Sequence, residues 1–512
     1  MKTLRCICRY YLLSLFIWAF GPAFAQERGF LTVCPDEDHS WFVTDALEIS
    51  EGCFVVCAND SWGDNSILLK ISSEGDVLGR TIIAAQDTTV FVRACLPVTR
   101  KTSREVIALC PCHPNDGSTA ALVLFRVDED LNVVYKKTIS CPFLDPGSRF
   151  YDTKFMLSDS SIYGALTTTP SGGMPEAIIL AKIDFDGNLL NYRNWGMDTI
   201  LAVGNLFHAE EGRIGLFGQF DSSHMGLLTI DSSLQPVSRD TIFQWSAPEG
   251  NNGDFCHYFI HDRINSHATM LPDGSHVVSA RMTESLYNAN GYPYNVHDQS
   301  AIFARYVNDF HQPDEYIITE HLNGSVEYPA FFRSVDVREA DQTECGVFQC
   351  TNLHELPQYG LMQPYPTGVV VTKTNQDLSV EWGKRYLEDD NYQAMVICAT
   401  SDGGCLVAGS LGEFQAQRFD VFALKINADG TVGVDEIQEE SMAFVYPNPA
   451  KDVIRIEGVE ARETKVFNAL GQQVMSFKGN EANAGTLTDG IYLLKITDSE
   501  GHIQTLRFVV NK

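Results

Sequence analysis

The sequence predicts an all-β protein: a β-propeller of about seven four-stranded blades, followed by a small C-terminal β-sandwich. Three observations support this prediction. A short apolar strand followed by a polar turn recurs through most of the chain, and a two-strand motif precedes each copy. Apolar residues nowhere keep the i, i+3, i+4 spacing of a helix over a long stretch.

Residues 1–25 are predicted to be a signal peptide that is cleaved on export. Three basic residues among the first nine positions precede the apolar run Tyr10–Phe20, and Ala23–Ala25 supplies small residues for a signal peptidase. The run is too short to span a bilayer, so we expect the mature chain to begin near Gln26. No later stretch is apolar for long enough to suggest a transmembrane segment in the mature chain.

The composition is strongly acidic, with 37 Lys and Arg against 66 Asp and Glu and a formal net charge of −29. Such a charge repels nucleic acid and anionic lipid, so we expect no nucleic-acid partner. Cations, basic partners and neutral glycans stay open. The sequence holds no phosphate-binding loop, dinucleotide fingerprint or metalloprotease motif, and we predict no cofactor.

The recurring strand appears seven times. Each copy is apolar with a basic residue or threonine near its end, and most copies precede a turn rich in Asp, Gly and Asn, which is a hairpin signal. The copies are Ile67–Ile71, Val123–Val127, Ile179–Ile183, Gly226–Ile230, Ile302–Tyr306, Val370–Thr374 and Phe422–Ile426. One of these turns, 184–188, also resembles the start of a calcium loop, but a downstream glutamate is missing and we expect a plain turn.

A second motif, strand–turn–strand, precedes the copies. It is clearest at Ala46–Val56, Ala268–Val278 and Val396–Gly409, with weaker versions at Val106–Cys112, Phe155–Leu166, Leu206–Phe217 and Ser334–Phe348. Each unit is therefore two hairpins, and four-stranded units repeated about every 50 residues predict a propeller, whose blades cover one another's faces. We assign residues 26–432 to it and expect seven blades, with six or eight left open by the uneven spacing.

The longest gap between copies, from Thr229 to Arg305, predicts insertions at 245–267 and 287–299. The first contains a group of weak candidates for metal binding or acid–base chemistry, which are His257, His261, Asp262 and His267. A chain with 13 His gathers such a group by chance, so we predict no metal site. Aromatic residues in the insertions would serve either to bind a sugar or protein or to pack the insertions onto the blades.

The 14 cysteines also leave two interpretations open. An exported chain can form disulfides, whereas cysteines within apolar strands behave as small buried side chains. The pairing cannot be deduced from the sequence.

A separate C-terminal domain is predicted from residue 443 to residue 512. Residues 433–442 are acidic and lack a strand pattern, which is typical of a linker. Short strands with frequent turns then predict a small β-sandwich, at Val453–Ile456, Glu463–Phe467, Gln473–Phe477, Gly490–Thr497 and His502–Val510.

Four sequence blocks in this tail occur in a fixed order and end at the last residue. Their key residues are Tyr446, Pro447, Asn448, Pro449, Gly471, Gly490, Tyr492, Lys495 and Lys512. With these blocks the tail resembles the type A C-terminal sorting domain of the type IX (Por) secretion system. An ordinary β-sandwich used for binding is the alternative.

The resemblance implies a route and partners. The type IX secretion machinery would carry the chain from the periplasm across the outer membrane, and a sortase-like peptidase would remove the tail. The mature protein would be secreted, or attached to surface lipopolysaccharide at the outer cell surface. The central repeats also resemble divergent propeller repeats of secreted bacterial proteins, which concerns the fold alone.

For the propeller itself we expect binding of a glycan or protein partner without catalysis, and no residue is assigned a catalytic role. A secreted glycan-acting hydrolase or lyase, with carboxylates at the centre of the ring, is the first alternative. A structural component of the surface layer is the second.

Overall fold

The computed structural model divides the chain into two compact units, residues 1–433 and 434–512. It describes residues 29–510 outside a set of gaps. The gaps are 37–38, 61–64, 85–87, 101–102, 159, 170–176, 196–201, 221–223, 243–244, 250–253, 261–265, 288–292, 308–309, 311–312, 319–324, 331, 340–344, 356–366, 388–390, 414–417, 433–443, 447–449, 452, 458–460, 469–471, 489 and 499–502. The signal peptide and linker expected from the sequence therefore lie outside the described residues.

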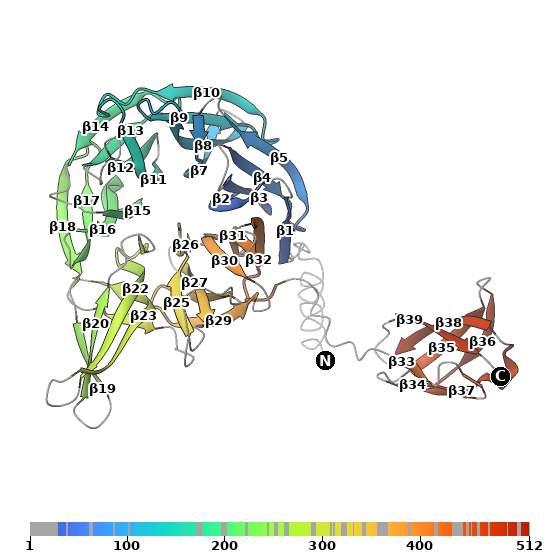
Figure 1. Ribbon diagram of the computed structural model, residues 1–512. Coiled ribbons are helices and arrows are strands. Elements are labelled where there is room, and N and C mark those ends of the chain that lie inside the picture. The colour runs from blue at the N-terminus through green and yellow to red at the C-terminus, as the bar shows by residue number, and fades with distance from the viewer. Residues whose placement is uncertain are drawn as a thin grey trace, which may run out of the picture. The chain divides into compact units, whose positions relative to one another are not determined.

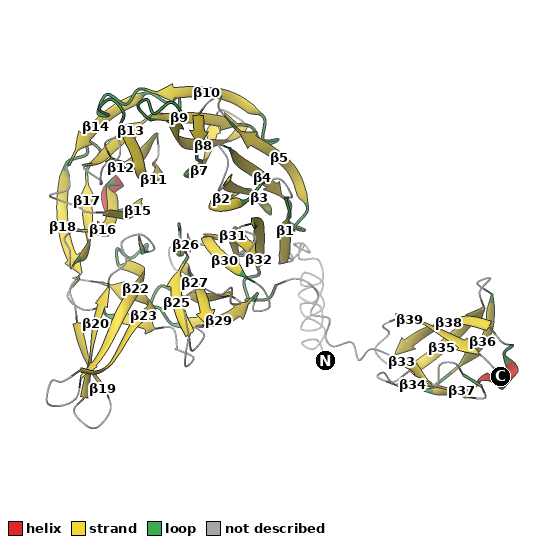
Figure 2. Cartoon of the chain, viewed as in Figure 1, coloured by secondary structure: helices red, strands yellow, loops and turns green. Residues whose placement is uncertain are grey.

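The first unit is a β-propeller whose seven antiparallel sheets surround a centre (Figures 1 and 2). The innermost strands are β2 (Trp41–Ser50), β7 (Ala94–Arg100), β11 (Arg149–Ser158), β15 (Ala202–His208), β21 (His267–Met270), β26 (Val335–Glu339) and β30 (Tyr392–Ala399). The second strands are β3 (Cys53–Asp60), β8 (Ser103–Pro114), β12 (Ser161–Thr169), β16 (Ile214–Gln219), β22 (His276–Tyr287), β27 (Cys345–Glu355) and β31 (Cys405–Glu413).

The third strands carry the sequence repeat. They are β4 (Ser66–Ile71), β9 (Ala121–Val127), β13 (Ala177–Ile183), β17 (Met225–Ile230), β23 (Pro293–Tyr306), β28 (Thr367–Thr374) and β32 (Arg418–Ile426). The outermost strands are β5 (Val77–Ile83), β10 (Val133–Ile139), β14 (Leu189–Asn194), β18 (Pro236–Ile242), β24 (Glu315–Ile318), β29 (Val380–Tyr386) and β1 (Phe30–Cys34). All seven repeat copies lie in third strands, which confirms the predicted propeller and its seven blades.

The N-terminal strand closes the ring. β1 pairs antiparallel with β32, from Phe30 opposite Lys425 to Cys34 opposite Val421, and so becomes the outermost strand of the seventh blade. The last blade is thus built from both ends of the propeller sequence. This pairing covers the outer edge of β32, an edge that would otherwise expose unpaired backbone groups.

Three blades carry an additional strand before the innermost one. β6 (Thr88–Val90), β20 (Asp254–Ile260) and β25 (Ser325–Pro329) pair with the far ends of β8, β22 and β27. In the fifth blade β19 (Trp245–Glu249) adds a further strand beside β20. The insertions predicted after Thr229 are therefore largely strands that lengthen this blade, and Figure 1 shows them extending beyond the ring.

The hydrophobic core lies between successive blades. β3 and β4 are buried almost throughout, whereas exposed and half-buried residues alternate along most of β5. One cluster joins Val55 and Leu68 of the first blade to Ala108 and Phe125 of the second. Because the inner strands are covered on both faces, their sequences are continuous apolar runs rather than alternating ones.

Most third strands end in the same polar turn. In four blades the side-chain Oδ1 of an Asp or Asn accepts the backbone N–H groups two and four residues later; these residues are Asp128, Asp184, Asp231 and Asn375. The calcium-like segment at 184–188 is one of these turns, so the Asp184 carboxylate already binds backbone N–H groups.

The second unit is a small β-sandwich. One sheet has the order β33 (Phe444–Tyr446), β34 (Val453–Glu457), β37 (Glu481–Asn483), and the other has β36 (Gln473–Phe477), β35 (Ala461–Asn468), β38 (Gly490–Asp498), β39 (Ile503–Val510). Ile454 and Ile456 from the first sheet share a core with Val466, Leu494 and Phe508 from the second. The described residues also include two short 3₁₀ helices, Glu210–Gly212 in the propeller and Ala484–Thr486 in the sandwich.

The structure contains both a disulfide and buried free cysteines, which are the two states that the sequence left open. Cys57 of β3 and Cys95 of β7 form a disulfide between the first two blades. Cys110, Cys350 and Cys405 are buried free thiols.

Candidate functional site

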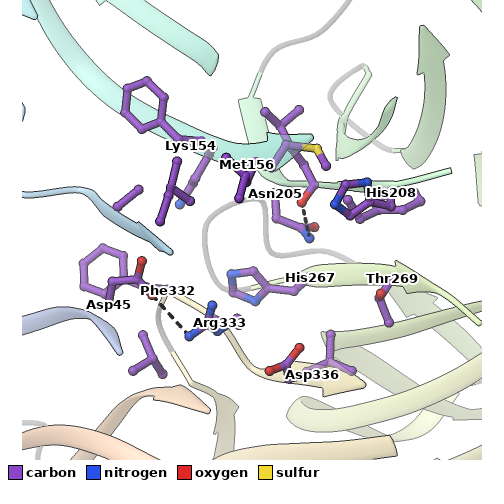
Figure 3. Close-up of a pocket in the computed structure, with 18 of the residues that line it drawn as sticks. Asp45, Lys154, Met156, Asn205, His208, His267, Thr269, Phe332, Arg333 and Asp336 are labelled. Atoms are coloured by element: carbon purple, nitrogen blue, oxygen red, sulfur yellow. Dashed lines mark hydrogen bonds and ion pairs between the residues drawn. The ribbon is translucent and has the colours of Figure 1, made fainter. Parts of the chain in front are cut away.

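A cavity of about 610 Å³ lies at the centre of the propeller. Residues from the innermost strand of every blade line it, from Thr44 and Asp45 of β2 round to Val396 of β30. Segments that are far apart in the sequence therefore meet there, as the close-up in Figure 3 shows. We take this cavity as the candidate functional site.

β-Bulges set the direction of several side chains around the cavity. The pairing of innermost with second strand shifts register between Val43 and Asp45, and again between Val203 and Asn205. A bulge leaves one extra residue on the strand and turns the following side chain to a new direction. In both cases the residue that follows the bulge is polar.

Both of these residues, together with Asp336 of β26, connect neighbouring blades. The Asp45 Oδ2 accepts the Cys95 N–H of the next blade at 2.8 Å, and the Asp336 Oδ2 accepts the Ala399 N–H at 2.8 Å. The Asn205 amide both accepts from Ala268 N–H at 2.9 Å and donates to its carbonyl at 2.8 Å. Each side chain satisfies backbone groups that the inner edge of a blade would otherwise leave unpaired.

Arg333 lies between the two carboxylates of the cavity. Its Nη2 is 3.2 Å from the Asp45 Oδ1, its Nε donates to the Ile397 carbonyl at 2.7 Å, and it also donates to the Ala46 carbonyl. Burial raises the pKa of Asp45 and of Asp336, and the Arg333 charge partly offsets that effect at both. The N–H groups of Arg333 therefore bind carboxylate and carbonyl oxygens of the protein itself.

Two other cations, Arg93 and Lys154, share one aromatic ring. The Arg93 guanidinium carbon and the Lys154 Nζ each lie 5.8 Å from the centre of the Phe332 ring. The Lys154 Nζ also lies 3.5 Å from the Asp152 Oδ2. Burial lowers the pKa of Arg93, with Asp152 acting in the opposite direction. Within the described part of the chain, the Arg93 guanidinium makes no hydrogen bond and no ion pair.

His267 is the most buried titratable side chain of the cavity wall, with 1% of its surface exposed. Its Nδ1 is 2.9 Å from the Ser334 Oγ, while its Nε2 makes no hydrogen bond with any described residue. Burial lowers the pKa of His267 to about 3, and the positive charge of Lys154 adds to this, whereas the Phe332 backbone acts in the opposite direction. The ring is therefore neutral at pH 7, and Nε2 can donate or accept one hydrogen bond.

Of the four candidates from the sequence, His267 lines the cavity. His257 lies in β20, a strand rather than the expected loop, and His261 and Asp262 lie outside the described residues. Among the residues that the structure places, no group of three His, Cys, Asp or Glu side chains is arranged to hold a metal ion.

Sequence reasoning missed Arg93, Lys154, Arg333 and the two carboxylates of the cavity. A single charged residue in a strand with a weak sequence pattern gives no local indication that it will face a cavity. The β-bulges that re-aim Asp45 and Asn205 are likewise visible only in the pairing.

In the sorting tail, four of the predicted signal residues are placed in strands. Tyr492 is buried in β38, and its hydroxyl donates to the Thr488 carbonyl at 2.8 Å. Gly490 begins the same strand, and Lys495 is exposed on it. Tyr446 ends β33, whereas Pro447, Asn448, Pro449, Gly471 and Lys512 lie outside the described residues.

Residues 444–511 match the family model described as a secretion system C-terminal sorting domain. These residues form a type IX sorting domain. The chain is consequently a substrate of the type IX secretion machinery and is exported to the cell surface or secreted, as the sequence predicted. Over the described residues, we find no helix with the length and apolar character needed to cross a membrane.

A curated relative is the ulvan lyase NLR42 of Nonlabens ulvanivorans, 31% identical over 88 residues. The match covers 16% of this chain and 16% of that protein, so the chain spans only a small part of the relative's length. The whole-protein activity of the relative does not transfer on such a match.

Similar solved structures include the β-propeller domain of the Trilobed protease from Pyrococcus furiosus. Its TM-score is 0.39 at 8% identity, covering 78% of this chain and 98% of that one. The NanB sialidase of Streptococcus pneumoniae has a TM-score of 0.36 at 11% identity, covering 79% and 71%. With TM-scores this low, the fold class rests on the seven sheets themselves.

Proposed function

We propose that the exported propeller binds a glycan in its central cavity and does not alter it chemically. The observation that supports this most strongly is the cavity itself, whose volume of about 610 Å³ falls in the range of roughly 300–1,000 Å³ typical of small-ligand sites. Its wall offers the Phe332 ring as a flat apolar surface. Beside it lie the Arg93 guanidinium and the His267 Nε2, which have no hydrogen-bond partner among the described residues. Sugars combine an apolar ring face with hydroxyl groups and match such a wall.

Binding is favoured over catalysis by what the carboxylates of the cavity do. Asp45 accepts the backbone N–H groups of Ala46 and Cys95, and Asp336 accepts those of Val337 and Ala399. These hydrogen bonds hold the carboxylates as connections between blades. A general acid or base needs an oxygen that can reach the substrate.

The test is a screen of the full chain against an array of neutral, acidic and sulfated oligosaccharides, followed by mass spectrometry of each bound sugar. We expect binding of at least one class and recovery of the sugar with its mass unchanged. Binding to none of them would overturn the proposal and favour the structural surface-layer role.

A glycan-acting hydrolase or lyase remains the second candidate. The observation that favours it is the raised pKa of Asp45 and Asp336, since carboxyl groups with raised pKa values in a cavity are common at catalytic sites. New reducing ends in the same screen would show a hydrolase, and unsaturated products would show a lyase. Either result would replace the proposal of binding without catalysis.

For export we propose the boundaries that the sequence indicates: a signal peptide over 1–25, a propeller over 26–432, a linker over 433–442 and a sorting domain over 443–512. We further propose that a sortase-like peptidase removes the sorting domain and that the product is released or joined to surface lipopolysaccharide. Intact-mass measurement of the secreted protein tests this. A mass that includes residues 443–512 would contradict removal of the tail.

A further inference from the structure

The charge of the central cavity differs from the charge of the protein as a whole. The chain has a formal net charge of −29, yet three basic side chains line the cavity against two acidic ones. The basic residues are Arg93, Lys154 and Arg333, and the acidic ones are Asp45 and Asp336. A local excess of positive charge inside a low-dielectric cavity attracts an anion even when the outer surface is acidic.

Not all of these charges are available to a ligand. Arg333 is held by Asp45 and by the carbonyl groups of Ala46 and Ile397, so it belongs to the wall. Lys154 faces one carboxylate of its own strand, Asp152, at 3.5 Å. Arg93 has no ion pair and no side-chain hydrogen bond within the described residues.

A half-buried guanidinium with no hydrogen bond or ion pair among the described residues is unusual, because burying a charge without a direct partner is costly. The contacts of Arg93 are aromatic: its guanidinium carbon lies 5.8 Å from the centres of both the Phe91 and the Phe332 rings. Two rings hold the planar group in place but satisfy none of its five N–H donors. The two rings thus position the guanidinium, and no described residue accepts a hydrogen bond from it.

The three available donors come from three different blades and gather around Phe332. Arg93 and Lys154 lie at the same distance, 5.8 Å, from the Phe332 ring. The charge of Lys154 and the Phe332 backbone both act on the ring of His267, whose Nε2 has no hydrogen-bond partner among the described residues. Figure 3 shows Lys154, His267 and Phe332 around one space.

We propose that Arg93 and Lys154 bind the acidic group of a sugar, a carboxylate or a sulfate, with His267 Nε2 as a neutral hydrogen-bonding partner. This inference rests on the proposed glycan binding and specifies its class as an acidic oligosaccharide. A carboxylate or sulfate can accept two parallel N–H bonds from a guanidinium, which is a strong and directional contact. A neutral glycan, one of the partners that the overall charge left open, would supply no anion to Arg93.

The test compares three kinds of oligosaccharide of equal length with the full chain in 0.15 M salt. They are a uronic-acid oligomer, which carries carboxylates, a sulfated neutral-sugar oligomer, and an uncharged oligomer. We expect one or both acidic kinds to bind at least about tenfold more tightly than the uncharged one, since hydrogen bonds to charged groups contribute about 1.5–3 kcal/mol. The two acidic arms distinguish carboxylate from sulfate.

Arg93→Gln should remove this preference while leaving the melting temperature close to that of the wild type. Lys154→Gln should reduce the preference by a smaller factor, because Asp152 already neutralises part of its charge. The matched control is Arg239→Gln, in which the lost guanidinium also lies over a ring, Phe220 at 4.5 Å, but on the exposed outermost strand β18. Arg239→Gln should retain wild-type binding.

The outcomes separate the two proposals. Equal binding of acidic and uncharged oligomers, or an acidic preference that survives in Arg93→Gln, would overturn the anion site but leave glycan binding intact. Binding of no oligomer at all would overturn both.

Discussion

At the scale of the residue, His267 is a buried, neutral imidazole whose pKa two nearby cations help to lower. Lys154 and Arg333 face it from two other elements, and burial together with their charges lowers its pKa from 6.5 to about 3. Ser334 fixes one ring nitrogen at 2.9 Å. This arrangement links the candidate site to the pH dependence of stability.

We predict that acid destabilises the protein partly through His267. As the pH falls from 6.5 toward 3, the unfolded chain binds a proton at this residue that the folded chain does not, so folding free energy is lost across this window. The loss approaches about 1.4 kcal/mol per pH unit. Urea unfolding of the wild type and of His267→Gln at pH 7 and pH 5 measures it.

The variant should lose less stability than the wild type between the two pH values. The half-buried histidines His113 and His276, whose pKa values desolvation lowers to about 4, are common to both proteins and cancel in the comparison. Equal losses in the two proteins would contradict the assignment of a neutral, buried His267.

The sequence alone could not predict that His267, Ser334 and Lys154 lie close together. His267 attracted attention because it lies near other histidines in the chain, but its actual neighbours are Ser334 and Lys154, from other blades. Which side chains face the cavity depends on β-bulges and on closure of the ring. Both are properties of the tertiary structure.

At the scale of the element, the turn after the third strand combines a polar cap with an apolar anchor. Leu131, Leu234 and Leu378 adopt positive φ angles of 62°, 64° and 56° in these turns. A leucine in this conformation is strained by about 1–2 kcal/mol. The strain is offset because the side chains are buried between the blades, with 0% of Leu234 exposed.

We predict that a glycine at position 234 is less destabilising than an alanine, which reverses the usual order of these two substitutions. Leu234→Ala should destabilise the protein by about 2–4 kcal/mol through lost packing. Leu234→Gly loses the same packing but relieves the strained φ, so it should be about 1 kcal/mol more stable than the alanine variant. Denaturant unfolding of the three proteins checks this. An alanine variant more stable than the glycine variant would show that the turn does not hold a positive φ.

We predict that the β1 strand is required for a closed ring. Phe30 is 6% exposed and packs with Phe54 at a ring-centre distance of 6.0 Å, whereas the adjacent Leu31 is 40% exposed. Phe30→Ala should cost about 3–5 kcal/mol and increase cleavage near β1 in limited proteolysis. Leu31→Ala is the control and should change little. Equal effects of the two substitutions would contradict a closing role for the buried face of β1.

At the scale of the whole molecule, the fold was the part that the sequence predicted best. The repeat marks the third strand of every blade, because that strand is buried on both faces and must be apolar in every copy. The closing role of β1 was not predicted, since a five-residue strand carries no sign of its distant partner. The net charge left cations, basic partners and neutral glycans open and gave no sign of the basic residues in the cavity, because it is a sum over the whole chain.

We predict that the sorting domain acts without the propeller. Residues 444–512 contain a complete sandwich with its own core. A reporter with a signal peptide and this tail should reach the medium or surface of cells that have the type IX machinery and stay in the periplasm of cells that lack it. Retention in both strains would contradict export by the tail alone.

The central claim is that the propeller holds an acidic sugar at its centre, and a crystal structure of the full chain with the tightest-binding oligosaccharide tests it most directly. We predict density for the sugar inside the cavity, with its carboxylate or sulfate within hydrogen-bonding distance of the Arg93 guanidinium and its ring on Phe332. Density for the sugar on the outer strands or the inserted β19–β20 hairpin, with the cavity free of it, would contradict the claim.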